Sequence, residues 1–299
     1  MMNLNFKKVE LEEKEFIDSF IKQQSSRNCS ICFANMYLWQ KHYKVEYTIV
    51  EDMLLFKSID SNPYFSYPIG GSDIKKALNA VMEYCKENNI EFKMYGLSEE
   101  EFAIIEKLYP GEFQVEYIRD DANYVYETEK LINLSGKKYH GKKNHVNKFK
   151  SLYADWKYED ITDENVAECI EMALEWRKIN LCDDDELKSA EFCVTLNALK
   201  KIKPLELIGG LIRANEKIVA ITIGEPLTKD TFVVHIEKAF SDVPGAYTII
   251  NQEFLAHHAA DYMYVNREED TGAEGLRKAK LSYKPVFMVE AGIVTKIHA

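Results

Sequence analysis

The sequence predicts an α/β protein with mixed sheets, built as two halves of similar size. The first observation is a pair of hairpin patterns, one in each half, accompanied by amphipathic helices and short strands. The second is length, because 299 residues suffice for two domains that each bury a core. The third is composition, since 46% hydrophobic and 29% charged residues are typical of a globular protein. Helices and strands in this mixture predict sheets covered by helices.

The first half is expected to contain a hairpin, two helices and two further strands. Two runs rich in β-branched and apolar residues flank Glu51-Asp52, which predicts the hairpin. Apolar residues in 73–85 recur at helical spacing, and Ser98 and Glu101 have the spacing of a capping box. In chain order we expect strands 45–50 and 53–57, helix 73–85, strand 92–95, a helix from Ser98 and an aromatic strand 117–126.

The second half repeats much of this order. A second hairpin is predicted around 215–217, and a strand that runs into a Pro-Gly turn begins a later helix. In chain order we expect helices 164–179 and 186–201, strands 205–213, 218–223 and 231–239, helix 245–260, strand 262–266, a short helix 275–280 and a last strand 286–293. We place the join near 128–135, which gives domains 1–127 and 128–299, and we expect the second to carry the working site.

Cysteine use and hydropathy predict a soluble, cytoplasmic protein that does not insert into a membrane. No window approaches eighteen consecutive apolar residues, and the first residues lack an apolar signal core. Several cysteines stand at apolar positions of helical patterns; the six are Cys29, Cys32, Cys85, Cys169, Cys182 and Cys193. The pair in Cys29-Ser-Ile-Cys32 lacks the second ligand pair of a structural zinc site, so we predict no metal.

The most localised feature is the basic segment, residues 136–150. It holds six lysines and two histidines and no acid, in a chain whose formal net charge is −11. That net charge disfavours DNA and any extended nucleic-acid groove, whereas a local basic patch still attracts an anion. We therefore predict phosphate binding by Lys137, Lys138, Lys142 and Lys143. A solvated helix face is the alternative.

Two later segments are further candidates for an anion site. In 235–251 a strand runs into a turn at Gly245 and Ala246, and backbone N–H groups at the start of a helix attract anions. Ordinary turn geometry explains the same glycine. In 266–285 a strand end with Asn266 and Arg267 is followed by a short basic helix; both a binding crevice and a solvated loop fit this pattern.

Together these segments resemble the family of phosphatidylglycerol lysyltransferase C-terminal domains. The residues that carry the resemblance read HIEKAF at 235–240, VPGAY at 243–247, YVNREED at 264–270 and EGLRKAKLSYKP at 274–285. The chain is also similar, more remotely, to the Fem-type aminoacyl transferases. Both groups have tandem GNAT-like (acyl-CoA N-acyltransferase) folds, so the resemblance implies such a fold here. Over residues 1–127 the resemblance rests on element order alone.

The resemblance implies transfer of an aminoacyl group from aminoacyl-tRNA, or of an acyl group from acyl-CoA, to an amine or hydroxyl acceptor. Lys280 matches the family lysine whose ammonium offsets an oxyanion at the transferred carbonyl. Arg277 and Lys278 would bind phosphate, and Glu237, on the strand that precedes the turn, is a second catalytic candidate.

Two departures from related proteins narrow the expected substrates. Of the loop that holds the pyrophosphate of coenzyme A in ordinary GNAT enzymes, this chain retains Gly245 and Ala246. It also lacks the transmembrane segments of full lipid-modifying synthases, so we expect a small-molecule or tRNA-borne substrate. The rival hypothesis is a non-catalytic protein that senses a phosphate-bearing metabolite. In either case we expect the basic segment to lie beside Arg277, Lys278 and Lys280, because two basic stretches form one anion site only where they converge.

Overall fold

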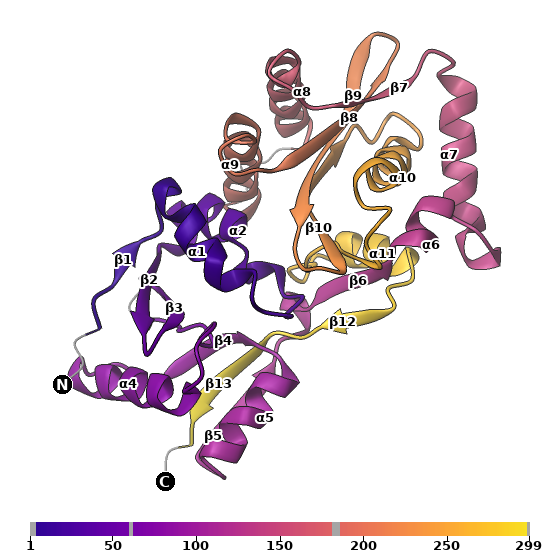
Figure 1. The fold of residues 1–299 in the computed structure, drawn as a ribbon. Helices are drawn as coiled ribbons and strands as arrows, with labels where there is room; N and C mark the ends of the chain where they lie inside the picture. The colour runs from indigo at the N-terminus through magenta and orange to yellow at the C-terminus, as the bar shows by residue number, and fades with distance from the viewer. Residues whose placement is uncertain (1–3, 60–61, 181–185, 298–299) are drawn as a thin grey trace. The chain divides into compact units, whose positions relative to one another are not determined.

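The computed structural model describes residues 4–59, 62–180 and 186–297, so Cys182 lies outside the described residues. The chain divides into two compact units (Figure 1). The first unit comprises residues 1–123, 269–272 and 288–299, and the second comprises 124–268 and 273–287. The second unit thus begins at Tyr124, four residues before the predicted boundary. Two segments of the predicted range 128–299, residues 269–272 and 288–299, belong to the first unit instead.

Two three-stranded sheets organise the first unit. The first has the order β1-β2-β3 and the second β4-β13-β5, and all their strand pairs are antiparallel. The elements are β1 Lys7–Lys8, η1 Leu11–Glu13, α1 Lys14–Ile21, η2 Cys29–Ile31, α2 Phe33–Leu38, α3 Gln40–Tyr43, β2 Val45–Val50, β3 Met53–Ser58, α4 Ile74–Glu87, β4 Lys93–Leu97, α5 Glu99–Leu108, β5 Phe113–Tyr117, η3 Arg119–Asp121 and β13 Gly292–Lys296.

The predicted hairpin, the predicted helix over 73–85 and the predicted capping box of the first unit are all present. The hairpin turn has Glu51 at φ +48° and Asp52 at φ +61°, the left-handed pair of a type I′ turn, which matches the twist of its strands. The side chain of Asp73 accepts from Lys76 N at 3.0 Å and caps α4. Ser98 and Glu101 form the predicted capping box at the start of α5.

A seven-stranded mixed sheet organises the second unit. Its order is β12-β6-β11-β10-β9-β8-β7, with β10 parallel to β11 and antiparallel to β9. The elements are β6 Asn123–Glu127, α6 Thr128–Asn133, η4 Lys137–Tyr139, α7 His140–Leu152, β7 Lys157–Asp160, α8 Val166–Ile179, α9 Glu186–Lys200, β8 Ile208–Ala214, β9 Lys217–Pro226, β10 Thr231–Ala239, α10 Ala246–His258, β11 Tyr264–Asn266, α11 Glu274–Ser282 and β12 Phe287–Val289.

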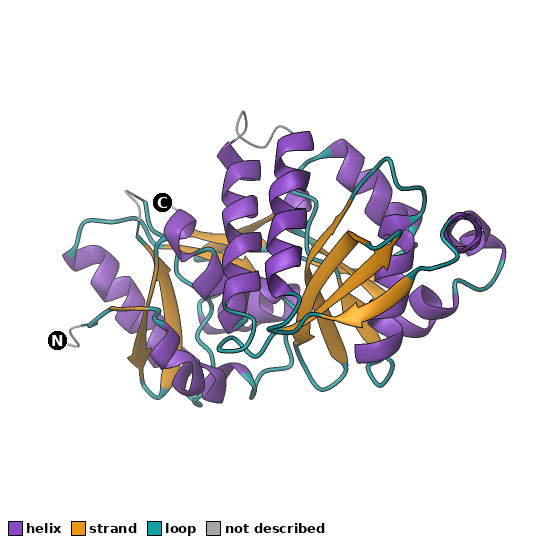
Figure 2. Cartoon of the chain, turned by 90° about the horizontal axis from the view of Figure 1, so that it is seen from above, coloured by secondary structure: helices purple, strands orange, loops and turns teal. Residues whose placement is uncertain are grey.

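Helices cover the sheet of the second unit. Helix α10 packs on β8, β9 and β10, while α8 packs on β9 and β10 and against α9. Figure 2 shows helices on both sides of these strands. Strand β9 accordingly has an unbroken buried run from Ile218 to Gly224, as expected of a strand with both faces covered. The mixed α/β fold is therefore confirmed.

Two predicted strands are wrong, because each is two strands. The aromatic stretch 117–126 divides into β5 and β6, separated by the charged turn η3. The last stretch, 286–293, divides into β12 and β13, and β13 pairs with β4 and β5. Strand β13 opens at Gly292, where a Cβ would lie 2.9 Å from the carbonyl oxygen of Leu97, so only glycine allows this approach.

Among the described residues, no helix is both long enough and apolar enough to cross a bilayer.

Candidate functional site

A buried polar group in the second unit contains several of the residues expected to act. We call it the Glu237 cluster: Glu237 on β10, Arg267 directly after β11, Asn251 on α10, Lys142 on α7 and Tyr283 at the end of α11. Strands β10 and β11 are parallel neighbours, with Val233 opposite Asn266, so their carboxyl ends lie at the same edge of the sheet. Ligands of α/β sheets bind at such edges.

An ion pair lies at the centre of the cluster. Arg267 Nη2 is 2.9 Å from Glu237 Oε1, and the two side chains are 11% and 12% exposed. Asn251 Nδ2 donates to the other carboxylate oxygen, Glu237 Oε2, at 3.1 Å. Both oxygens of Glu237 thus hold neighbouring side chains, which fixes the direction in which Arg267 and Asn251 present their remaining atoms.

Two atoms of this cluster are buried without a protein partner. Among the described residues, neither Arg267 Nη1, a donor, nor Asn251 Oδ1, an acceptor, makes a hydrogen bond. The orientation of the amide is settled by Glu237, whose carboxylate accepts from Nδ2 and so directs Oδ1 elsewhere. Buried polar atoms are normally paired, and leaving one unpaired costs about 1–3 kcal/mol. The two side chains that bind the Glu237 carboxylate thus each have one buried polar atom without a hydrogen-bond partner.

Lys142 adds a second cation to the cluster. Its Nζ lies 3.8 Å from the centroid of the Tyr283 ring. Burial and, to a smaller extent, the charge of Arg267 lower the pKa of Lys142 to about 8, and Glu237 opposes the shift. Lys142 is the only one of the four predicted lysines that is not exposed, since Lys137, Lys138 and Lys143 all face solvent.

Tyrosine rings enclose the cations. The guanidinium carbon of Arg267 lies 4.7 Å from the ring centroid of Tyr283 and 5.8 Å from that of Tyr126. Burial raises the pKa of Tyr283, while Arg267 lowers it. Tyr126 donates its hydroxyl to the carbonyl of Lys280 at 2.8 Å, which ties α11 to the sheet.

Lys280 is buried and holds the backbone of the cluster. Its Nζ donates to the carbonyl oxygen of Arg267 at 2.5 Å and lies 5.7 Å from the ring centroid of Tyr124. Because the amide N–H of Arg267 also donates to the Tyr124 carbonyl at 2.9 Å, the residue that carries the guanidinium is held from both sides.

The other predicted residues have different surroundings. Lys278 is exposed and pairs with Glu274 at 3.3 Å within α11, while Arg277 is partly buried in the same helix. Asn266 is fully buried, and its side chain accepts from Glu268 N at 2.7 Å. The contact between Lys142 and Tyr283 links the basic segment to the end of α11.

Gly245 and Ala246 lie where α10 packs against α7. Gly245 has φ +89°, and a Cβ there would lie 2.4 Å from the carbonyl oxygen of His145 and 3.0 Å from Phe149 Cβ. Ala246 is 1% exposed. Close helix packing explains both small residues, independently of any anion.

Sequence reasoning did not select Asn251, Tyr126 or Tyr283 as site residues. Asn251 stands in the apolar stretch Thr-Ile-Ile-Asn of α10 and is 2% exposed, so a polar residue at a core position was the available signal. Tyr283 belongs to the GLRKAKLSYKP motif, but its role depends on Lys142, which is 141 residues away in the chain.

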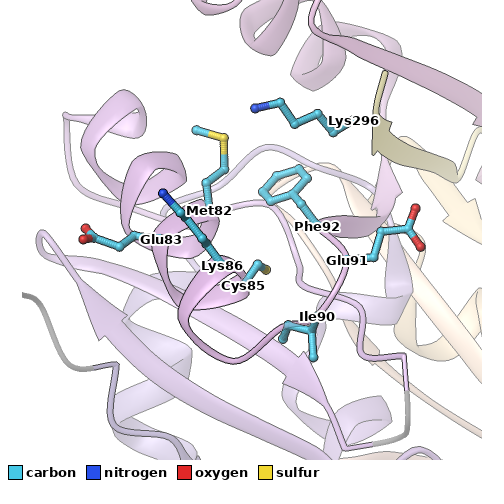
Figure 3. A pocket seen from close by; sticks show the side chains of 8 residues that line it. All are labelled: Met82, Glu83, Cys85, Lys86, Ile90, Glu91, Phe92 and Lys296. Atoms are coloured by element: carbon cyan, nitrogen blue, oxygen red, sulfur yellow. The ribbon is translucent and has the colours of Figure 1, made fainter. Parts of the chain in front are cut away.

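The first unit contains a pocket that shares no residue with the Glu237 cluster. It measures about 490 Å³ and is lined by Met82, Glu83, Cys85, Lys86, Ile90, Glu91, Phe92 and Lys296 (Figure 3). Burial raises the pKa of the Cys85 thiol to about 11, so this cysteine is not a thiolate nucleophile at neutral pH. No residue predicted to act lines this pocket.

The cysteines of the CxxC pair are buried thiols of the first unit. The backbone N–H and the Sγ of Cys29 both donate to Asn123 Oδ1, at 3.1 Å each. Asn123 in turn donates to Glu269 Oε2 at 3.2 Å. Cys29 is thereby part of a hydrogen-bond network between segments of the first unit that are distant in the sequence.

Comparison with known proteins gives one family. The family model described as phosphatidylglycerol lysyltransferase, C-terminal, matches residues 21–290. An uncharacterised protein of Mycoplasmoides gallisepticum, MYCGA3080, is 28% identical over 196 residues, which cover 62% of this chain and 60% of that protein. The match thus spans less than two thirds of the length of this relative.

Solved structures show the same fold. A conserved protein of unknown function from Bacteroides thetaiotaomicron is 36% identical, with a TM-score of 0.95 over 99% of this chain and 100% of that one. The C-terminal domain of an Agrobacterium fabrum protein described as a lysylphosphatidylglycerol synthetase has a TM-score of 0.70 at 12% identity, over 96% and 92% of the two chains. L-PGS from Bacillus licheniformis has a TM-score of 0.67 at 12% identity, over 98% and 94%. The chain therefore has the fold of these solved structures, and the predicted mixed α/β fold class is confirmed.

Proposed function

Because this chain belongs to the family of phosphatidylglycerol lysyltransferase C-terminal domains, we propose that it transfers an aminoacyl or acyl group to an amine or hydroxyl acceptor at the Glu237 cluster. The observation that carries the proposal is the pair of buried, unpaired atoms, Arg267 Nη1 and Asn251 Oδ1. A buried donor and a buried acceptor whose side chains bind the same carboxylate are suited to hold a carbonyl group and its N–H or O–H neighbour.

In the proposed reaction, Arg267 Nη1 donates to the carbonyl oxygen of the group that is transferred. Negative charge develops on this oxygen when the acceptor attacks, and a preorganised cation in a buried site stabilises it. Glu237 fixes the guanidinium through Nη2, and Lys280 fixes the backbone of Arg267. Lys280 would therefore act on the developing charge indirectly, because its ammonium holds the backbone of Arg267 and Arg267 contacts the oxyanion.

We propose aminoacyl-tRNA as the donor, ahead of acyl-CoA. An acyl-CoA donor in the usual GNAT arrangement needs an open turn for its pyrophosphate, and here Gly245 packs closely against the carbonyl of His145 and against Phe149. The exposed Lys137, Lys138 and Lys143 provide positive charge for a tRNA phosphate. Since aminoacyl-tRNA is a cytoplasmic donor, we place the proposed reaction in the cytoplasm and its site in the second domain.

A donor screen tests the proposal. The purified chain is incubated with radiolabelled aminoacyl-tRNAs and acyl-CoAs, each with amine acceptors, hydroxyl acceptors and vesicles that contain phosphatidylglycerol. We expect at least one donor to be consumed and its label to appear in an acceptor. Arg267→Gln should reduce this transfer by 100-fold or more, because the variant loses the cation at the carbonyl. The exposed lysine of α9, in Lys200→Ala, provides the control and should leave transfer unchanged.

If the chain binds a donor but never consumes it, the result would support the rival hypothesis, a non-catalytic protein that senses a phosphate-bearing metabolite. The proposal is wrong if no donor of either class is consumed with any acceptor, including the lipid vesicles. It is also wrong if Arg267→Gln transfers the label as fast as the unaltered chain.

A further inference from the structure

Lys142 differs from every other lysine of the basic segment in its surroundings. It lies in the first turn of α7 and is partly buried, whereas the five others in the segment, at 137, 138, 143, 148 and 150, are exposed. Within the described part of the chain, no carboxylate forms an ion pair with Lys142, and its contact is with the face of Tyr283 at 3.8 Å. The acid that acts on it electrostatically is Glu237, whose two oxygens already bind Arg267 and Asn251.

These surroundings disfavour a permanent ammonium. Burial removes water from the charged form, and the guanidinium of Arg267 repels it; the ring of Tyr283 acts in the opposite direction. The pKa of Lys142 is lowered to about 8, from 10.5 for an ordinary lysine. At pH 7.5 about a quarter of the molecules then carry an uncharged amine, compared with about 0.1% for an exposed lysine. An uncharged amine has a lone pair that can accept a proton.

We propose that Lys142 is the general base of the transfer reaction. Its uncharged Nζ accepts the proton of the acceptor as the acceptor nitrogen or oxygen attacks the carbonyl carbon. The bond from that carbon to the leaving oxygen of tRNA, or to the leaving sulfur of coenzyme A, then breaks. The ammonium of Lys142 returns the proton to the leaving atom, so Lys142 is uncharged again after each turnover and no further reactant is needed. This assignment rests on the proposed function of the Glu237 cluster.

Lys142 suits this role better than the one carboxylate of the cluster. Glu237 accepts from Arg267 and Asn251 with its two oxygens, so taking a proton would disrupt the ion pair that orients Arg267. Lys142 has no such partner to lose. A general base is most effective when its pKa lies near the working pH, and the lowered pKa of Lys142 meets this condition.

Direct titration tests the proposal without any assay of activity. Lysines are labelled by reductive methylation with a ¹³C source and followed by NMR from pH 6 to 11, and Lys142→Arg identifies the signal of Lys142 by its absence. We expect this signal to titrate near pH 8 and the exposed lysines to titrate about two pH units higher. If the Lys142 signal titrates together with the exposed lysines, the proposal is overturned.

The kinetics of Lys142→Arg distinguish two roles for Lys142, a general base and a cation that binds phosphate. Arginine keeps the positive charge but does not release a proton at these pH values. With the donor that the screen identifies, Lys142→Arg should reduce turnover by at least 100-fold, keep donor binding within about threefold and lose the rise of rate towards pH 8. Turnover that survives in Lys142→Arg, or an equal loss of binding and turnover, would overturn the proposal. Failure of the unaltered chain to consume any donor would instead count against the proposed function, whereas the titration decides on Lys142.

Discussion

Arg267 Nη2 lies 2.9 Å from Glu237 Oε1, and neither side chain is more than 12% exposed. A buried pair of this kind contributes little net stability over apolar residues, but it is costly to break on one side. Its position at the ends of two parallel strands agrees with a role in positioning the guanidinium.

Removal of one partner should destabilise the protein strongly. Glu237→Ala leaves the guanidinium of Arg267 buried without its counter-ion, and we expect the free energy of unfolding to fall by about 3–5 kcal/mol. The double variant Glu237→Leu/Arg267→Met removes both charges and should restore much of that stability, yet show no transfer activity. Chemical denaturation and the donor assay measure the two properties. Full activity in the double variant would show that the pair is structural alone.

Asn251 should affect activity more than stability. In Asn251→Leu the bond to Glu237 is lost, but so is an unpaired buried acceptor, and the two effects oppose each other. We expect the free energy of unfolding to change by at most about 1 kcal/mol, while transfer falls at least tenfold. A variant that is several kcal/mol less stable and as active as the unaltered chain would contradict a ligand-facing Oδ1.

The pH dependence of stability provides a test of Lys142 in the folded protein. The folded pKa of about 8 lies below the 10.5 of an ordinary lysine, so the unfolded chain binds more protons between these values and stability rises with pH across that window. Lys142→Met should therefore be more stable than the unaltered chain at pH 7, by about 1–2 kcal/mol after screening by solvent. The difference should vanish as the pH approaches 10.5. A difference that does not depend on pH would show that Lys142 is not perturbed.

Gly245 should tolerate no side chain. Gly245→Ala places a methyl group 2.4 Å from the carbonyl oxygen of His145 at a φ of +89°, and we expect a loss of about 2–4 kcal/mol. Gly275→Ala is the matched control, since a Cβ there meets nothing within 4 Å and the residue lies in helix α11. The control should be neutral or slightly stabilising. Equal stability of the two variants would contradict the close packing of α10 on α7.

Much of the fold follows from local patterns. The hairpin at Glu51-Asp52, the helix over 73–85 and the capping box of Ser98 and Glu101 were predicted because turn residues, caps and periodicity act over a few neighbours. The break between β12 and β13 was not predicted, because a continuous apolar stretch does not reveal that its two ends pair in different sheets. That choice depends on partners that are far away in the sequence.

Some features of the candidate site could be predicted from the sequence, and others could not. The basic segment and the tail could be singled out from charge and motif, but not which lysine turns inward. Lys142 differs from Lys143 because of Tyr283, and helical spacing alone does not disclose that contact. The pairing of Asn251 with Glu237 likewise joins α10 to β10 across the core. The roles assigned to these residues remain predictions.

The central claim is that the Glu237 cluster transfers an acyl group, and single-turnover transfer from aminoacyl-tRNA tests it most directly. The purified chain, in excess, is mixed with tRNA that carries a radiolabelled aminoacyl group and with the acceptor panel, and the label is followed with time in Arg267→Gln, Lys142→Arg and Lys200→Ala. We predict that the unaltered chain and Lys200→Ala move the label from tRNA to an acceptor, while the two cluster variants do so at least 100-fold more slowly. Transfer at equal rates by all four proteins would contradict the claim.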